Sequence, residues 1–161
     1  MEQYHLQNRP TRELKLDSEI IAILKSGKYT VISMCRNNEP YIVTLSYGFD
    51  AGRNSLYFHC ATKGLKLDFI RSNPNVCATV IDDGGYVMGH CEHNYKTVVF
   101  WGQLKVVTDM EERIHGMNVL LNHLEQDSGV IAHYLVKSND QASKMEILRL
   151  DIIQIHGKAG K

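Results

Sequence analysis

The residues with the clearest chemical potential lie where a histidine-containing strand turns into a helix. The stretch YFHCATKGLKLDF places His59 on the strand and Thr62, Lys63, Gly64 and Lys66 at the turn. The first N–H groups of a helix are unsatisfied and, with the helix dipole, favour an anion. Thr62 could cap the helix, and a bound phosphate would explain two lysines at an otherwise unfavourable position. The alternative is a pair of solvated lysines, because this pattern is less specific than a P-loop.

Small polar residues on the two preceding strands form a second candidate surface. A short turn joins these strands, so we expect them to pair and to share an apolar interior face. A planar ligand could approach the backbone on the outer face, although polar outer faces are also normal in antiparallel sheets. The residues expected on that face are Thr44, Ser46, Tyr57 and His59.

Other reactive side chains have weaker patterns. GHCEHN brings His90, Cys91 and His93 together, but a structural zinc site needs four ligands, so a flexible loop is the favoured reading. His115 and His123 are two helical turns apart and are read as helix-surface residues.

Trp101 is predicted to face outward if its neighbour Phe100 and the nearby Leu104 face inward. Val99 and Gln103 would share its face. An exposed tryptophan on a barrel serves either as a dimer contact or as a stacking partner for a ring.

The composition limits the class of protein. The chain has 161 residues, enough for one domain with a sizeable core, and 18 Lys and Arg balance 18 Asp and Glu. Zero net charge gives no overall attraction to nucleic acid or to an anionic membrane. No apolar run could span a bilayer, and MEQYHLQNRPTREL lacks a signal-peptide pattern. We therefore expect a single cytoplasmic domain over residues 1–161.

The four cysteines are widely spaced, with no CxxC motif, at positions Cys35, Cys60, Cys77 and Cys91. The first three lie in apolar, strand-like stretches. Because the cytoplasm keeps thiols reduced, we expect free thiols, buried at those three positions.

Periodicity divides the chain into short elements without repeats or linkers. The predicted helices are Asp17 to Lys25, capped by Asp17 or Ser18, Leu65 to Ser72, and Met110 to Leu124. The predicted strands are Thr30 to Cys35, Tyr41 to Asp50, Ser55 to Ala61, Val76 to Ile81, Tyr95 to Thr108, and Glu146 to His156. The stretch DDGGYVMGHCEHN is predicted to be a loop.

The last strand changes its apolar face between Ile152 and Ile153, which is what a β-bulge does. Gly102 inside the preceding strand indicates a bend. Bulges and mid-strand glycines curl a sheet into a barrel. The sequence therefore predicts a mainly β fold, a six-stranded antiparallel barrel with peripheral helices.

Three stretches together resemble a known family. PYIVTLSYGFD, LYFHCATKGLKLDFIRSNPNVCATV and YKTVVFWGQLKVV are similar to the pyridoxamine-phosphate-oxidase-like FMN-binding split barrels, and most similar to the Nim-type nitroimidazole-resistance proteins. The resemblance covers about Leu24 to Val107. It implies a split barrel that dimerises, with FMN at the subunit interface.

The resemblance also implies roles for individual residues. Thr44, Leu45, Ser46 and Tyr47 would lie along the isoalloxazine ring, Thr62, Lys63 and Lys66 would hold the phosphate, and His59 would be the active-site histidine. Thr97, which stands where many relatives have serine, and Trp101 would complete the cofactor site.

The implied function is an FMN-dependent oxidoreductase that passes electrons to a small acceptor such as a nitroaromatic. No Rossmann glycine-rich turn is present, so the electron donor is left open. The alternative is a non-catalytic flavin- or haem-binding protein, because split barrels support both. The segment that carries substrate residues in true pyridoxamine-phosphate oxidases is not recognisable, so that activity is not predicted.

Overall fold

The computed structural model describes residues 10–125 and 145–160 of the chain. Most of the N-terminal segment MEQYHLQNRPTREL, in which no signal-peptide pattern is found, lies outside the described residues. Within them the strands are β1 Glu13–Leu14, β2 Tyr29–Arg36, β3 Glu39–Ser46, β4 Gly48–Asp50, β5 Ser55–Ala61, β6 Asn75–Val87, β7 Glu92–Val106 and β8 Met145–Gly160. The helices are α1 Asp17–Ser26, α2 Leu65–Ser72 and α3 Met110–Leu124, with a short 3-10 turn at Pro10–Arg12.

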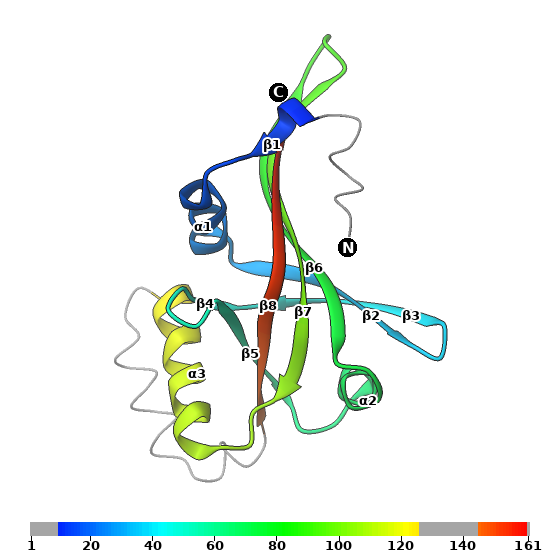
Figure 1. Cartoon of the computed structure of the whole chain (residues 1–161), viewed down its shortest axis with the longest axis vertical. Coiled ribbons are helices and arrows are strands. Elements are labelled where there is room, and N and C mark those ends of the chain that lie inside the picture. The colour runs from blue at the N-terminus through cyan, green and yellow to red at the C-terminus, as the bar shows by residue number, and fades with distance from the viewer. Residues whose placement is uncertain (1–9, 126–144, 161) are drawn as a thin grey trace.

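The strands form one antiparallel sheet in the order β3-β2-β6-β7-β8-β5-β4, and β1 adds to β8. Its two end strands, β3 and β4, are consecutive in the chain and are joined at Tyr47, so the sheet curls back on itself. Figure 1 shows the helices at the periphery of this sheet. The predicted mainly β, antiparallel split-barrel fold is confirmed.

The described residues hold eight strands and not the six predicted. One extra strand arises because the predicted strand Tyr41 to Asp50 breaks at Tyr47 into β3 and β4. The other is the two-residue β1. At the break the Tyr47 side chain is fully buried, and its hydroxyl donates to Leu24 O at 2.7 Å.

This break makes the predicted pairing of Tyr41 to Asp50 with Ser55 to Ala61 largely wrong. Only β4 pairs with β5, through Gly48 opposite Tyr57 and Asp50 opposite Ser55. The whole of β3 pairs with β2 instead. Thr44 and Ser46 therefore lie at one end of the strand order, and Tyr57 and His59 lie near the other.

The barrel interior is filled by alternate residues of the strands. Leu56, Phe58 and Cys60 of β5 point inward as predicted, and they meet the fully buried Ile32, Phe100, Leu104, Leu148 and Leu150. A second, smaller cluster of Tyr57, Val107 and Ile147 lies beneath α3. Tyr57 was expected on the outer surface, but α3 covers it. Gly116 permits this close approach, since a Cβ there would lie 2.5 Å from Tyr57 Cδ1.

The predicted bulge in the last strand is confirmed. Trp101 pairs with Gln154, but the next residue, Gly102, pairs with Ile152, so Ile153 is the extra residue and is 70% exposed. Gly102 lies where a side chain would collide with the Asp151 carbonyl of β8. The bulge and the glycine together bend the two longest strands, as barrel closure requires.

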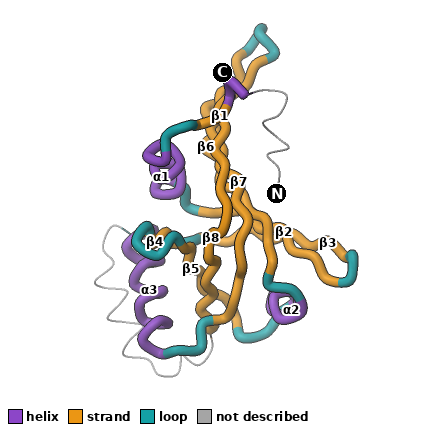
Figure 2. The backbone as a smooth tube through the Cα atoms, viewed as in Figure 1, coloured by secondary structure: helices purple, strands orange, loops and turns teal. Residues whose placement is uncertain are grey.

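The stretch 82–94 is not the predicted loop. β6 continues to Val87 and β7 starts at Glu92, and only the tip between them is a turn. The register between β6 and β7 shifts at Gly84 and Gly85, and Tyr86 then pairs with His93. Figures 1 and 2 show the resulting hairpin standing clear of the rest of the molecule.

The helices have nearly the predicted bounds, but two predicted caps are wrong. The N-cap of α1 is Leu16 and that of α2 is Gly64, and neither makes a side-chain cap bond. At α3, Asp109 accepts a hydrogen bond from Glu112 N at 2.9 Å.

The four thiols are free, as predicted. Cys60 is buried and Cys77 is half-buried, and burial raises the pKa of both thiols. Cys35 is exposed, contrary to the prediction, because it points to the outer side of the β2–β3 hairpin.

Candidate functional site

Four of the predicted cofactor residues share the outer face of the sheet. Strand registers place Thr44, Val31, Thr79 and Val99 in one row across β3, β2, β6 and β7. Ser46, Thr97 and Trp101 point to the same side, because each is an even number of residues from a member of that row. Thr44 and Ser46 are exposed, whereas Thr97 and Trp101 are half-buried.

This outer face also carries apolar side chains. Tyr29, Ile42 and Ile81 are 63%, 64% and 57% exposed, and Val31 and Val99 are half-buried between them. We call these five residues, together with Thr44, Ser46, Thr97 and Trp101, the outer face. Trp101 packs edge-on against the ring of His156, with centroids 5.9 Å apart. The predicted outward direction of Trp101 and Val99 is confirmed, since Phe100 and Leu104 are fully buried.

Two of the predicted ring contacts point away from this face. Leu45 packs against the core, and Tyr47 is fully buried. Burial raises the pKa of the Tyr47 phenol well above its usual range. Neither side chain is therefore available to a ligand on the outer face. β3 is an end strand of the sheet, however, so its main-chain groups on the side away from β2 could hydrogen-bond a flat ring.

The second part of the site is the turn between β5 and α2. His59 is exposed on β5, and Lys63 is exposed, while Thr62 and Lys66 are half-buried. Lys66 is close enough to Cys60 to oppose the effect of burial on the pKa of that thiol. Gly64 adopts a φ of 141°, which favours glycine, and open space surrounds the position of its missing Cβ.

The start of α2 is chemically open to an anion. No side chain caps it, and Leu67 N reaches back to Gly64 O at 3.0 Å. With Thr62, Lys63 and Lys66 next to it in the chain, this first turn offers N–H groups, a hydroxyl and two ammonium groups. These are groups that bind phosphate.

Helix α2 is tied to the hairpin that carries Thr44. Phe69 packs against Tyr41 with ring centroids 5.0 Å apart, and the Arg36 guanidinium lies 4.5 Å above the Phe69 ring. Asn73 Nδ2 also donates to Cys35 O at 3.0 Å. These contacts hold the second half of α2 beside the β2–β3 hairpin, and Figure 1 shows α2 next to it.

The structure thus brings the predicted residues into two groups. Thr44, Ser46, Thr97 and Trp101 lie on the outer face, and His59, Thr62, Lys63 and Lys66 surround the end of β5. The predicted sharing of one paired-strand face by Thr44 and His59 does not occur, because β3 and β5 do not pair.

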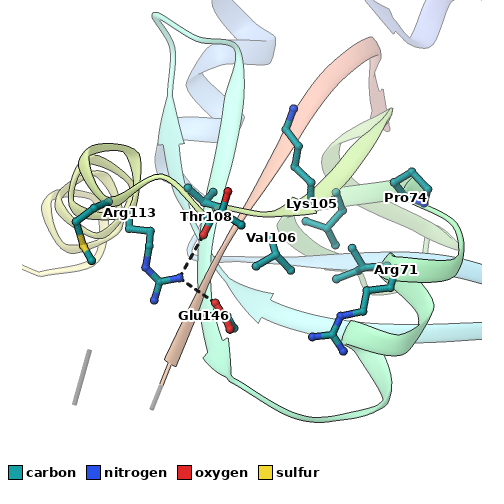
Figure 3. A pocket seen from close by; sticks show the side chains of 11 residues that line it. Arg71, Pro74, Lys105, Val106, Thr108, Arg113 and Glu146 are labelled. Atoms are coloured by element: carbon teal, nitrogen blue, oxygen red, sulfur yellow. Dashed lines mark hydrogen bonds and ion pairs between the residues drawn. The ribbon is translucent and has the colours of Figure 1, made fainter. Parts of the chain in front are cut away.

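A groove of about 860 Å³ lies on neither group and was not predicted. It runs between the end of α2, the end of β7 and the start of α3 (Figure 3). Arg113 crosses it and donates to Glu146 Oε2 at 2.9 Å and to Met145 O at 2.8 Å. The groove brings α2 and Glu146 of β8 to the connection between β7 and α3, and these segments are far apart in sequence, so no local pattern signals it.

A charged network on the β5–β8 side was also missed. His115 Nε2 lies 2.7 Å from Asp50 Oδ2, and Glu112 accepts from Tyr57 and Arg149. Burial acts to raise the pKa of Asp50, but hydrogen bonds from His115 and from Arg53 N outweigh it and hold that pKa below its usual range. This network fastens α3 to the sheet.

His123 is not the helix-surface residue that was predicted. Its Nε2 donates to Gly27 O at 2.6 Å and its Nδ1 accepts from Phe49 N at 3.5 Å, which requires a neutral ring. Burial lowers its pKa. The signal was present in the sequence, since Gly116, Leu120 and His123 follow the spacing of a buried helical stripe.

The cluster His90, Cys91 and His93 lies at and beside the tip of the β6–β7 hairpin. All three are exposed, and His93 Nε2 lies 2.7 Å from Asp83 Oδ1. The described residues contain no group of three or more side chains arranged to hold a metal ion. Nor do they include a helix with the length and apolar character needed to cross a membrane.

Solved structures share this fold. A protein of Bacteroides thetaiotaomicron, provisionally named as a 5-nitroimidazole antibiotic resistance protein, matches with a TM-score of 0.78 and 20% identity over 92% of this chain and 86% of its own. A FAD-binding protein of Mesorhizobium loti matches with a TM-score of 0.69 and 21% identity, over 93% of this chain and 98% of its own. The FAD and heme binding protein of Mycobacterium smegmatis matches with a TM-score of 0.77 and 15% identity, over 93% of this chain and 74% of its own.

A curated relative, an uncharacterised protein of Rhizobium meliloti, is 26% identical over 107 residues. That match spans 63% of this chain and 64% of the relative's length. A broader match is to a protein family: residues 17–159 match the model of the family described as "Pyridoxamine 5'-phosphate oxidase". This match includes every strand from β2 to β7, both groups of site residues and nearly all of β8. The chain belongs to the pyridoxamine 5'-phosphate oxidase family.

Proposed function

We propose that this protein binds FMN and passes electrons from the reduced flavin to a small acceptor such as a nitroaromatic. The observation that carries the proposal is the uncapped start of α2, with Thr62, Lys63 and Lys66 around it and open space at Gly64. The name of the Bacteroides relative supports the acceptor class. When bound, the flavin would supply the electron transfer, and the chain would bind and orient it.

FMN fits this site better than FAD. The proposed phosphate cradle, the first turn of α2 with Thr62, Lys63 and Lys66, would hold one phosphate, and the sequence has no glycine-rich turn for a pyrophosphate. Two of the structurally similar proteins are named for FAD, so the two cofactors must be distinguished directly. Releasing the cofactor from the purified protein and measuring its mass identifies it, and FAD would contradict the proposed cofactor.

His59 is proposed as the proton donor or orienting group for the acceptor. It is exposed near the end of β5, three residues before Thr62. An imidazole nitrogen can carry a proton and transfer it to an acceptor atom. Thr44, Ser46, Thr97 and Trp101 would line the ring from the outer face.

The working form is proposed to be a cytoplasmic homodimer. Tyr29, Ile42 and Ile81 are more than half exposed on one continuous sheet face, which is larger than the scattered apolar exposure of a monomer. A second copy packed there would bring a second set of residues to the two groups of site residues.

The second candidate function is a flavin- or haem-binding protein without catalysis. It is favoured by the similarity to a protein named for both FAD and haem. The absorption spectrum of the purified protein separates flavin from haem. Reduced protein mixed with nitroaromatics and then with oxygen separates enzyme from carrier, because a carrier shows no turnover that depends on the acceptor.

A further inference from the structure

The β6–β7 hairpin ends in apolar side chains that the described part of the chain leaves uncovered. β8 follows β7 only as far as Tyr95, and the register of β2 along β6 ends at Thr79. Beyond these positions the hairpin is a two-stranded ribbon, which is marginally stable alone. Tyr86 is 53% exposed and Met88 is 83% exposed. We call residues 86–92 the ribbon tip.

The ribbon is acidic as well as apolar. Residues 82–95 include Asp82, Asp83 and Glu92, and no lysine or arginine. All three carboxylates are exposed, and Asp83 is paired with His93. Of these three carboxylates only Glu92 lies in the ribbon tip, so a surface that complements the tip would offer an apolar lining and a cation for Glu92.

The groove has this character. Its apolar lining includes Ile70, Val106 and Met110. Its cations are Arg71, Lys105 and Arg113 (Figure 3). Among the lining residues only Glu146 is acidic, and Arg113 holds it at 2.9 Å. Arg71 and Lys105 also have acidic neighbours, Asp68 at 3.7 Å and Asp151 at 2.6 Å. Arg71 is 61% exposed in that loose pair, so it remains accessible to a partner.

The groove and the ribbon tip lie at opposite ends of the same hairpin. In the groove, Pro74 directly precedes β6, and residues 105–108 lie at the end of β7 and just after it. The ribbon tip joins the other ends of these two strands (Figure 1). Glu92 and Val106 are 14 positions apart, which is about 46 Å at 3.3 Å per residue. The ribbon tip cannot reach the groove of its own chain.

A two-fold axis through the middle of the hairpin exchanges its two ends. The midpoint of β7 between Glu92 and Val106 is Val99, which pairs with Thr79 next to the exposed Ile81. This is the centre of the outer face. An axis perpendicular to the strands at this point would place each ribbon tip over the groove of a second copy, in a closed, isologous arrangement.

We propose that the ribbon tip of each protomer docks into the α2–β7–α3 groove of a second copy of this chain. The proposal rests on the homodimer of the proposed function and adds its arrangement. Each groove includes Ile70 and Arg71 of α2, so the docked tip would also fix the helix whose first turn carries the phosphate cradle.

Cross-linking tests the arrangement directly, because Cys91 already lies exposed in the ribbon tip. In a Cys35→Ser background, Met110→Cys places a second thiol at the groove. Oxidation with diamide should give a covalent dimer that depends on Cys91 and disappears with Cys91→Ser. The matched control is Lys25→Cys, exposed on α1 and remote from the groove, which should not cross-link faster than the background.

Met88→Glu tests the apolar anchor. It should raise the dissociation constant of the dimer by roughly 10-fold or more, as expected for a buried anchor residue. Leu16→Glu, at a position 60% exposed before α1, is the control and should leave that constant unchanged. Sedimentation equilibrium gives the constants, and flavin fluorescence gives cofactor binding in the same samples.

The outcomes separate the docking from the function. A dimer that binds flavin but shows neither the Cys91-dependent cross-link nor a Met88→Glu effect would overturn the docking and leave the proposed function standing. A wild-type monomer that binds flavin would overturn both the docking and the dimer. A dimer that cross-links as expected but binds no flavin would retain the docking and overturn the proposed function.

Discussion

Two residues of β5 show how much the surroundings decide at the residue scale. Tyr57 and His59 both point outward from the same strand, as their spacing predicts. Tyr57 is fully buried because α3 covers it, whereas His59 lies beyond the helix and is exposed. Strand alternation fixes the direction of a side chain, but only the tertiary packing of a distant helix decides whether water reaches it.

The role of His59 can be tested by its removal. If it supplies a proton to the acceptor, His59→Ala should retain flavin and lose about 10²–10⁴-fold in the rate of acceptor reduction per bound flavin. Equal rates per bound flavin in stopped-flow measurements would mean that His59 is only a wall of the site. His90→Ala, at an exposed histidine of the ribbon tip, is the control.

The lysines at the start of α2 give a second residue-scale prediction. Lys63→Ala with Lys66→Ala should weaken FMN binding by roughly 10-fold or more, because each charge-assisted contact to a phosphate is lost. Riboflavin, which lacks the phosphate, should bind both proteins alike. Fluorescence titration measures the four constants, with Lys25→Ala as the control for a change in charge. Unchanged FMN affinity in the double variant would contradict the proposal that these lysines hold the phosphate.

At the scale of elements, the bounds of α3 were predictable but its docking was not. Periodicity and the acidic first turn define Met110 to Leu124. The contacts of His123 with Gly27 and Phe49, however, join α3 to segments about 75 to 95 positions away. The hairpin shows the converse. Two glycines and two aspartates predicted a loop, and cross-strand pairs such as Tyr86 with His93 outweighed these local preferences.

His123 makes the docking of α3 dependent on pH. Its folded-state pKa is lowered by burial, so the unfolded chain binds a proton more readily than the folded one. The stabilising contribution is complete above the unfolded pKa of about 6.5 and is lost as the pH falls toward the lower folded-state pKa. Unfolding in urea at pH 7.5 and at pH 5.5 should show this loss.

The matched variants for that measurement are His123→Gln and His90→Gln. The first should lower stability at pH 7.5 and flatten the dependence on pH, whereas the second, at an exposed position, should preserve the wild-type slope. If His123→Gln retained the full slope, the pH dependence would belong to other groups. The aspartates Asp50 and Asp151 have lowered pKa values, so their effects fall at lower pH.

At the scale of the whole molecule, the bulge and Gly102 predicted a curled antiparallel sheet, and both features lie where they were expected. The order of the strands could not be obtained in this way. It depends on the break at Tyr47, where β3 ends and the buried tyrosine hydroxyl donates to Leu24 O. The break separates β3 from β5 and divides the candidate site into two groups within one chain.

That division is the physical reason to expect a dimer as the functional unit. The residues proposed to line the ring lie on an apolar face that residues 10–125 and 145–160 of one chain leave exposed, and those proposed to hold the phosphate lie apart from them. Ile81→Lys puts a charge at the centre of the outer face, where Ile81 pairs with Thr97. It should convert the dimer to a monomer in sedimentation experiments, since an unpaired charge would be buried in the interface. FMN binding should weaken in the same samples.

The control is Ile153→Lys, at the still more exposed bulge residue of β8, which should leave both properties unchanged. A monomeric Ile81→Lys protein with full FMN affinity would show instead that one chain is sufficient for the cofactor, and that the two groups of residues do not form one site.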